Sequence, residues 1–157
     1  MSFSHLGLFS VPRAVVTETE NRLRQAGGSN SELFVLWSGL IDGTQFVVRT
    51  AHVPRQTSYR LESGLLVRVE GDALHQLNIW LYEHEEVLAV QVHAHPTDAF
   101  HSETDDAYPI VTARGSLSIV AADFCRDGLL CDDSAVYRLD DQGWYRLDSP
   151  FKLIRVS

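Results

Sequence analysis

VLAVQVHAHP, residues 87–96, is a mostly apolar run that ends in two histidines one residue apart, His93 and His95. An apolar run of this length that ends at a proline predicts a strand, because proline cannot continue the hydrogen-bonded ladder. Alternate side chains of a strand point to the same face, so the two imidazoles would converge where this strand ends. Pro96 would then turn the chain away from the sheet.

A serine and two adjacent aspartates follow this run within a few residues, at Ser102, Asp105 and Asp106. Two imidazoles and one carboxylate, held on a strand end and a returning segment, match a zinc site with three protein ligands, and such a site leaves the fourth position for water. A single histidine on a strand more often belongs to the core or the surface, whereas the pair with the nearby Ser-x-x-Asp unit favours a metal. We therefore predict a catalytic Zn²⁺ centre.

The overall composition is typical of a soluble globular protein. Hydrophobic residues make up 45% of the 157 residues, charged residues 22%, and the net charge is -8 with histidine neutral. This acidic balance argues against a nucleic-acid partner and against anionic membranes. No apolar run approaches the ~20 residues of a membrane helix, and the first residues lack the charged start and apolar core of a signal peptide. We expect a cytoplasmic protein with one domain over residues 1–157.

Two cysteines, Cys125 and Cys131, are spaced unlike the CxxC unit of a metal or redox motif. We interpret them as small hydrophobic side chains or weakly paired thiols near a turn.

The periodicity of apolar residues predicts helices and strands in alternation. In the first half we expect a helix capped by Ser10 and ended by Gly27-Gly28, an apolar strand over 32–37, a turn at Asp42-Gly43, a partner strand over 44–50 and a polar loop over 53–66. In the second half we expect a helix from Ala73 to about His84 capped by Asp72, the histidine strand, a short helix that begins at Ser102, a strand over 116–121, a hairpin of 135–139 with 144–147 and a last strand over 151–156. These elements predict an α/β fold with a mixed sheet between or beside two main helices.

The pattern His93-x-His95-Pro96, followed by Ser102-x-x-Asp105, resembles the zinc motif of the JAMM (JAB/MPN+) metalloproteases. In that family the histidine pair at a strand end and the aspartate near a helix start bind zinc. The order of elements resembles the family over nearly the whole chain. The resemblance implies an MPN (JAB)-like fold, which is a mixed β-sheet flanked by two main helices and a short motif helix.

The family also has a general base, a glutamate on an earlier strand, and Glu32 at the start of the first apolar strand matches it. The resemblance implies that Glu32 accepts a proton from zinc-activated water and passes it to the leaving amine. It further implies that Ser102 donates a hydrogen bond to the developing oxyanion, which is typically worth ~3 kcal/mol in the transition state. Without the family, a solvated charge is the plainer interpretation of Glu32, and Ser102 could be only a helix cap.

One feature departs from the family pattern, because the loop between His95 and Ser102 is about one residue shorter. If the Ser-x-x-Asp spacing is measured from Ser102, the third zinc ligand is Asp105. If the usual loop length is measured from His95, the third ligand is Asp106. We favour Asp105, since the Ser-x-x-Asp unit is a rigid helix start and a loop deletion is the smaller change, and Asp106 stays the alternative.

The compact size resembles the bacterial branch of the family, found with ubiquitin-like proteins and E1- or E2-like enzymes, including antiviral-defence operons. The resemblance therefore implies a zinc isopeptidase that cleaves after the C-terminus of a ubiquitin-like protein, in a precursor or a conjugate. In the polar segment 54–66, Arg55 and Arg60 could steer an acidic partner or could be ordinary loop charges. Two other functions stay open, a non-catalytic MPN scaffold and a small-substrate JAB hydrolase that acts on a carrier protein.

Further polar residues near the motif have plain interpretations. Asp98 and His101 lie in the loop after the histidine strand and could be metal ligands, but solvated loop side chains are the plainer interpretation. His52 lies where a loop or surface position explains it.

Overall fold

The computed structural model describes residues 1–61, 64–101 and 110–157, without the side chains of 60–66. In chain order its elements are β1 (Leu8–Val11), α1 (Arg13–Gly28), β2 (Val35–Asp42), β3 (Gln45–His52), β4 (Gln56–Leu61), β5 (Gly64–Val69), α2 (Gly71–His84), β6 (Val87–Ala94), β7 (Leu117–Ala121), the short 3-10 helix η1 (Asp123–Cys125), β8 (Ala135–Asp140), β9 (Gly143–Arg146), the 3-10 helix η2 (Pro150–Lys152) and β10 (Ile154–Val156). Among these residues, no helix is both long and apolar enough to cross a bilayer.

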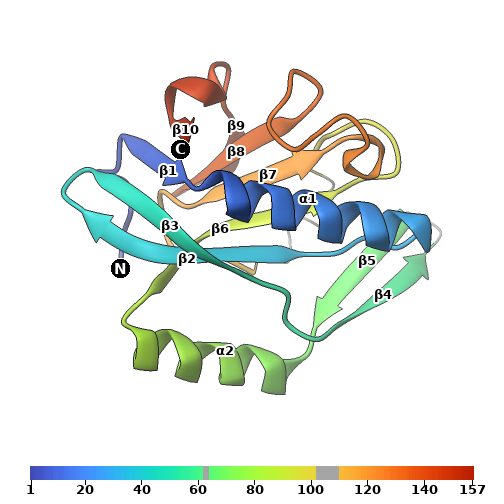
Figure 1. Cartoon of the computed structure of the whole chain (residues 1–157), viewed down its shortest axis with the longest axis horizontal. Coiled ribbons are helices and arrows are strands. Elements are labelled where there is room, and N and C mark those ends of the chain that lie inside the picture. The colour runs from blue at the N-terminus through green and yellow to red at the C-terminus, as the bar shows by residue number, and fades with distance from the viewer. Residues whose placement is uncertain (62–63, 102–109) are drawn as a thin grey trace.

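One mixed sheet organises the molecule, and β6 lies at its centre (Figure 1). Across the described residues this sheet has eight strands in the order β10-β1-β3-β2-β6-β7-β8-β9. Strand β6 runs antiparallel to β2 and parallel to β7. The predicted α/β architecture with a mixed sheet is therefore confirmed, and the histidine-bearing strand is an interior strand of the sheet.

The two long helices pack on opposite faces of this sheet. Leu23 of α1 belongs to the same buried cluster as Trp37 of β2. Leu77 of α2 belongs to a second cluster with Leu36, the neighbour of Trp37 on β2. Because adjacent residues of a strand point to opposite faces, the helices cover the two sides. Figure 1 shows α1 across the front of the sheet and α2 below it.

The sheet begins with a strand that the sequence pattern did not predict. Residue Ser10 lies in β1, whose four residues pair in parallel with β3 on one side and with β10 on the other. The prediction of Ser10 as a helix cap is wrong, because its backbone is extended and hydrogen-bonded into the sheet. Pro12 precedes α1 instead, with a φ of -63°. The C-terminal strand β10 continues this pairing to Ser157, whose N–H donates to the Val11 carbonyl at 3.0 Å.

Helix α2 ends at His84, as predicted, because Glu85 takes the left-handed conformation with a φ of 54°. Its beginning differs from the prediction. Asp72 lies inside the first turn, and its carboxylate binds the Arg55 guanidinium on the preceding segment. The main partner of Asp72 is therefore the Arg55 side chain, and this hydrogen bond is the largest cause that lowers the pKa of Asp72.

The polar segment 53–66 was predicted as a loop that could hold a short extended piece, but most of its described residues lie in two strands. Strands β4 and β5 form an antiparallel hairpin, separate from the main sheet. At its base the Glu70 N–H donates to the Arg55 carbonyl at 3.0 Å, and the Thr57 hydroxyl donates to the Glu70 carboxylate at 3.0 Å. Strand β4, QTSYRL, is mostly polar and lacks the apolar alternation of a core strand, so the sequence pattern did not predict its pairing with β5.

The remaining predicted strands are present with shifted ends. Strand β2 begins at Val35 rather than at residue 32, and the Asp42-Gly43 turn is confirmed, with Gly43 at a φ of 62°. The strand over 116–121 and the following hairpin are observed as β7, β8 and β9. The last predicted strand is split into η2 and β10. The helix expected to begin at Ser102 lies outside the described residues.

Candidate functional site

The two motif histidines lie side by side at the carboxyl end of β6. His93 pairs with Val120 of β7, and His95 follows the strand with its N–H donating to the Ala121 carbonyl at 2.9 Å. The extended backbone thus continues through His95, which keeps both rings on one side. His93 is 0% and His95 is 6% exposed, and their Nε2 atoms are 3.3 Å apart. The predicted convergence of the two imidazoles is therefore present in the structure.

Glu32 lies beside this pair. It precedes β2 by three residues rather than starting the strand, and it is only 8% exposed. Its Oε1 is 4.0 Å from Nε2 of His95. Antiparallel pairing of β2 with β6 explains this position, because Val35 at the start of β2 pairs with Val92 near the end of β6. The plainer interpretation, a solvated charge at a strand start, does not fit this burial.

The donor chemistry at the end of β6 suits a zinc ion. Tetrahedral zinc binds imidazole nitrogen at about 2.0–2.1 Å, which places two nitrogen ligands about 3.3–3.4 Å apart. The Nε2 atoms of His93 and His95 have this spacing, 3.3 Å. Among the residues that the structure describes, no group of three potential ligands that could hold a metal is found. The predicted third ligand Asp105, its alternative Asp106 and the predicted oxyanion donor Ser102 lie outside the described residues.

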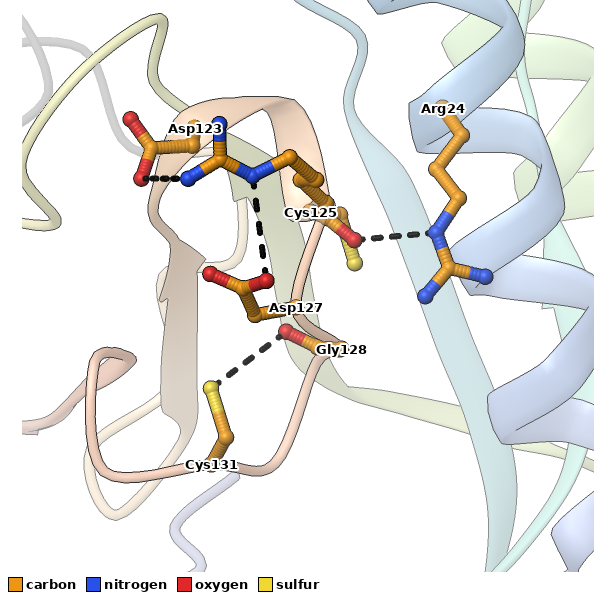
Figure 2. Close-up of polar contacts among 7 residues, drawn as sticks. Arg24, Asp123, Cys125, Asp127, Gly128 and Cys131 are labelled. Carbon is orange, nitrogen blue, oxygen red and sulfur yellow. Dashed lines mark hydrogen bonds and ion pairs between the residues drawn. The ribbon is translucent and has the colours of Figure 1, made fainter.

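A left-handed turn fixes the chain next to His95. Asp123, Phe124 and Cys125 have φ values of 50°, 53° and 67°, a conformation that costs about 1–3 kcal/mol for each such residue. The Phe124 N–H donates to the His95 carbonyl at 2.8 Å. On the other side of the turn, Arg24 of α1 donates from Nε to the Cys125 carbonyl at 2.9 Å (Figure 2). The turn is therefore held between helix α1 and the backbone of the second histidine.

Neither cysteine offers a nucleophile. Cys125 is fully buried, and burial raises the pKa of its thiol to about 12, so the thiolate is not formed near neutral pH. Cys131 is half-buried, and its Sγ donates to the Gly128 carbonyl at 3.6 Å (Figure 2). Both thiols are free. They fit the interpretation as small apolar side chains.

A serine, a histidine and a glutamate also meet away from the motif. The Ser38 hydroxyl donates to the Glu86 carboxylate at 2.7 Å, so Nε2 of His52, also 2.7 Å from the Ser38 oxygen, acts as a donor to it. Burial lowers the pKa of His52, and the nearby Glu86 opposes this effect. Because the serine proton points to the carboxylate and Ser38 is 0% exposed, this set is no catalytic triad. His52 is half-buried and is the last residue of β3, so it lies in a strand rather than in the helix or loop predicted for it.

His101, predicted as a solvated loop residue, is packed instead. Its ring stacks on Tyr137 with centroids 4.1 Å apart, and its Nε2 is 2.7 Å from the Ser118 hydroxyl. Its centroid is 6.1 Å from that of His93. Asp98 is exposed, as predicted.

A buried glutamine connects this region to the centre of the sheet. Gln91 shares a face of β6 with His93 and is 1% exposed. Its Oε1 accepts hydrogen bonds from the N–H groups of Ile110 and Val111 at 3.1 and 3.0 Å. Its Nε2 donates to Ser118 at 3.2 Å, the hydroxyl that also contacts His101. The described residues on both sides of 102–109 are thus tied to one face of β6 and β7.

The role of Gln91 as a buried hydrogen-bonding residue was not predicted, although the sequence carries a signal for it. A lone amide inside the apolar run VLAVQV must be buried with the strand, and a buried amide needs hydrogen-bond partners. The pattern indicates that partners exist but cannot name backbone groups some 20 residues away in the chain.

Replacing Gln91 by leucine is expected to lower the free energy of unfolding by about 2–4 kcal/mol, because it leaves the buried Val111 N–H and the partly buried Ile110 N–H without their acceptor. Urea denaturation measures the change. The matched control is Ser116→Ala, which removes a buried hydroxyl that has no hydrogen bond among the described residues. A loss no larger for Gln91→Leu than for this control would contradict the anchoring role.

Three comparisons place the chain among known proteins. No family model matches it. It is 38% identical over 131 residues to "Probable metalloprotease y4jG" of Sinorhizobium fredii, and the match covers 83% of this chain and 81% of that relative. The solution structure of protein DSY2949 from Desulfitobacterium hafniense is similar, with a TM-score of 0.65, 16% identity and coverage of 96% of this chain and 93% of that one. At that identity the structural likeness concerns the fold alone.

Proposed function

The chain belongs to the same metalloprotease family as y4jG of Sinorhizobium fredii, and we propose that it is a JAMM-type zinc peptidase with Glu32 as its general base. Its metal ligands in this proposal are His93, His95 and Asp105, with Asp106 as the alternative to Asp105. The observation that carries the proposal is the buried pair of imidazoles, with Nε2 atoms 3.3 Å apart and the Glu32 carboxylate beside them.

Zinc at this position would supply a Lewis acid that polarises a carbonyl group and lowers the pKa of water. The chain itself supplies the proton transfers. The Glu32 carboxylate accepts the proton of the attacking water and then delivers it to the leaving amine. Burial of Glu32 between the protein's own side chains shields its carboxylate from bulk solvent, which strengthens the electrostatic interactions of that carboxylate. Ser102 donates a hydrogen bond to the oxyanion in this scheme.

The fold supports an MPN-like assignment through its arrangement. An interior strand carries the histidine pair, and a mixed sheet lies between two long helices. The glutamate precedes the strand that pairs antiparallel with the histidine strand. We extend the proposal to one cytoplasmic domain over residues 1–157 from the bacterial branch of that family.

The proposed substrate is the C-terminal tail of a ubiquitin-like protein, in a precursor or in a conjugate made by E1- and E2-like enzymes. Such extended tails commonly bind by adding a strand to an exposed edge. Strand β4 pairs only with β5 among the described strands, and its Tyr59 is 43% exposed. Arg55 is already paired with Asp72, which weakens its proposed role in steering an acidic partner. The side chain of Arg60 lies outside the described residues.

The test is cleavage of a fusion between a ubiquitin-like protein and a reporter at its C-terminal glycine. We expect cleavage by the wild-type protein, loss of cleavage after treatment with a zinc chelator, and recovery when Zn²⁺ is added back. Binding of the fusion without cleavage by zinc-loaded protein would indicate a scaffold. Hydrolysis of only small amides or carrier-bound amino acids would indicate a small-substrate hydrolase. Full activity of metal-free protein would reject the mechanism.

A further inference from the structure

The first residue of β4 reaches across to the segment that carries Glu32. The side-chain amide of Gln56 accepts a hydrogen bond from the Phe34 N–H at 2.8 Å and donates to the Phe34 carbonyl at 3.0 Å. It also donates to the carbonyl of Pro54 at 2.9 Å. The glutamine side chain thus pairs with both backbone groups of Phe34, as a peptide group of a neighbouring strand would.

Phe34 lies where the sheet gives no other support. The ladder between β2 and β6 begins at Val35, and the ladder between β2 and β3 begins at Leu36. The backbone bonds to Gln56 therefore replace a strand partner one residue before the sheet starts. Phe34 is 6% exposed, and its ring lies 4.6 Å from the ring of His93 between centroids. Its position is thus fixed by the glutamine on one side and by the histidine pair on the other.

We propose that Gln56 is a positioning residue for Glu32. The glutamate is two residues before Phe34, so holding both backbone groups of Phe34 limits where the Glu32 carboxylate can lie relative to His95. The inference rests on the proposed function, in which that carboxylate is the general base. Small errors in the position of a base lower the rate of proton transfer, because the base must stay within hydrogen-bond reach of the proton.

The same contact links the hairpin to the proposed base. Gln56 belongs to β4, and the base of the hairpin is fixed to helix α2 through the ion pair of Arg55 with Asp72, and to Glu70, the residue just before that helix, through Thr57. A displacement of the hairpin therefore displaces Phe34 and, with it, Glu32. A tail bound along β4 would therefore change the position of the Glu32 carboxylate through the Gln56 side chain.

The test compares Gln56→Leu with Thr57→Val, a matched change at the next residue of β4, whose hydroxyl bonds to Glu70. In Gln56→Leu we expect the Phe34 amide to exchange with solvent about tenfold faster, as for the loss of one hydrogen bond of ordinary strength. We also expect a shift of the Glu32 carboxyl signal in ¹³C NMR. Neither change is expected in Thr57→Val. These two readouts need no substrate and can be measured without metal.

Activity supplies the third readout. With zinc-loaded protein and the ubiquitin-like fusion, Gln56→Leu should lower kcat about tenfold or more, with a smaller change in KM and unchanged zinc affinity. In a Glu32→Gln background it should cause no further loss, because a positioning residue acts through the group it positions. An equal loss in both backgrounds would overturn the inference, as would unchanged Phe34 exchange and an unchanged Glu32 signal. A wild-type protein that cleaves nothing would reject the proposed function, while the NMR readouts would still show whether Gln56 sets the position of Glu32.

Discussion

Replacing Glu32 by glutamine is expected to lower kcat for cleavage of the ubiquitin-like fusion by about 10²- to 10⁴-fold, the range typical of a lost general base. The amide has almost the same volume as the carboxylate but cannot accept the proton of the attacking water. Glu32 is nearly buried, 4.0 Å from the nearest nitrogen of His95. Initial rates with saturating fusion measure the effect, and zinc content and thermal unfolding of the same samples show whether metal and fold are retained.

The control is Glu83→Gln, which removes a carboxylate from the exposed surface of α2. We expect this variant to retain wild-type activity within about twofold, because an exposed charge is screened by solvent. Equal cleavage by Glu32→Gln and the wild-type protein would remove Glu32 from the mechanism. A simultaneous loss of zinc would instead make it a ligand.

The second large effect is expected from the histidine pair. His93→Asn and His95→Asn should each reduce bound zinc from about one ion per chain to a small fraction, since a three-ligand site that loses one ligand rarely holds the metal. Cleavage should fall with the metal. Zinc content after dialysis, measured by atomic absorption, gives the result. His75→Asn on the exposed side of α2 is the matched control and should leave the metal in place.

Zinc content after dialysis, measured on Asp105→Ala and on Asp106→Ala, identifies the third zinc ligand. We expect loss of zinc in the first variant and retention in the second. The reverse outcome would show that the shortened loop after His95 moves the ligand by one position. Loss in neither variant would mean that a different group completes the site.

The sequence predicted the central strand and its histidine pair because their signal is local. An apolar run of eight residues carries its own periodicity, and alternation alone determines that His93 and His95 share a face. The end of helix α2 was predicted at about His84 from signals that are equally local, whereas its predicted cap, Asp72, lies inside the first turn. To predict the position of Glu32, the antiparallel register of Val35 with Val92 must also be known. No single segment of the sequence contains this register. Its burial beside His95 therefore became visible only in the structure.

Other elements have no local signal at all. Strand β1 is only four residues long, and its parallel neighbours are residues 45–47 and 154–156. Because these partners are distant in the sequence, no local pattern indicates the strand, and Ser10 was predicted as a helix cap instead. Strand β4 is mostly polar, so no apolar alternation in the sequence indicates its pairing with β5. Gln56 and Gln91 act through backbone groups far along the chain, and partners of this kind cannot be inferred from spacing.

The pairing of β1 with β10 has a consequence for biosynthesis. One of the two edges of β1 stays uncovered during synthesis until residues 154–157 have emerged. Closing a contact between residues so far apart in the sequence is entropically costly and slow compared with local contacts. The nascent chain therefore carries an open strand edge for as long as residues 12–153 are being made, and such edges are where chains associate wrongly. Only the synthesis of β10 removes this edge.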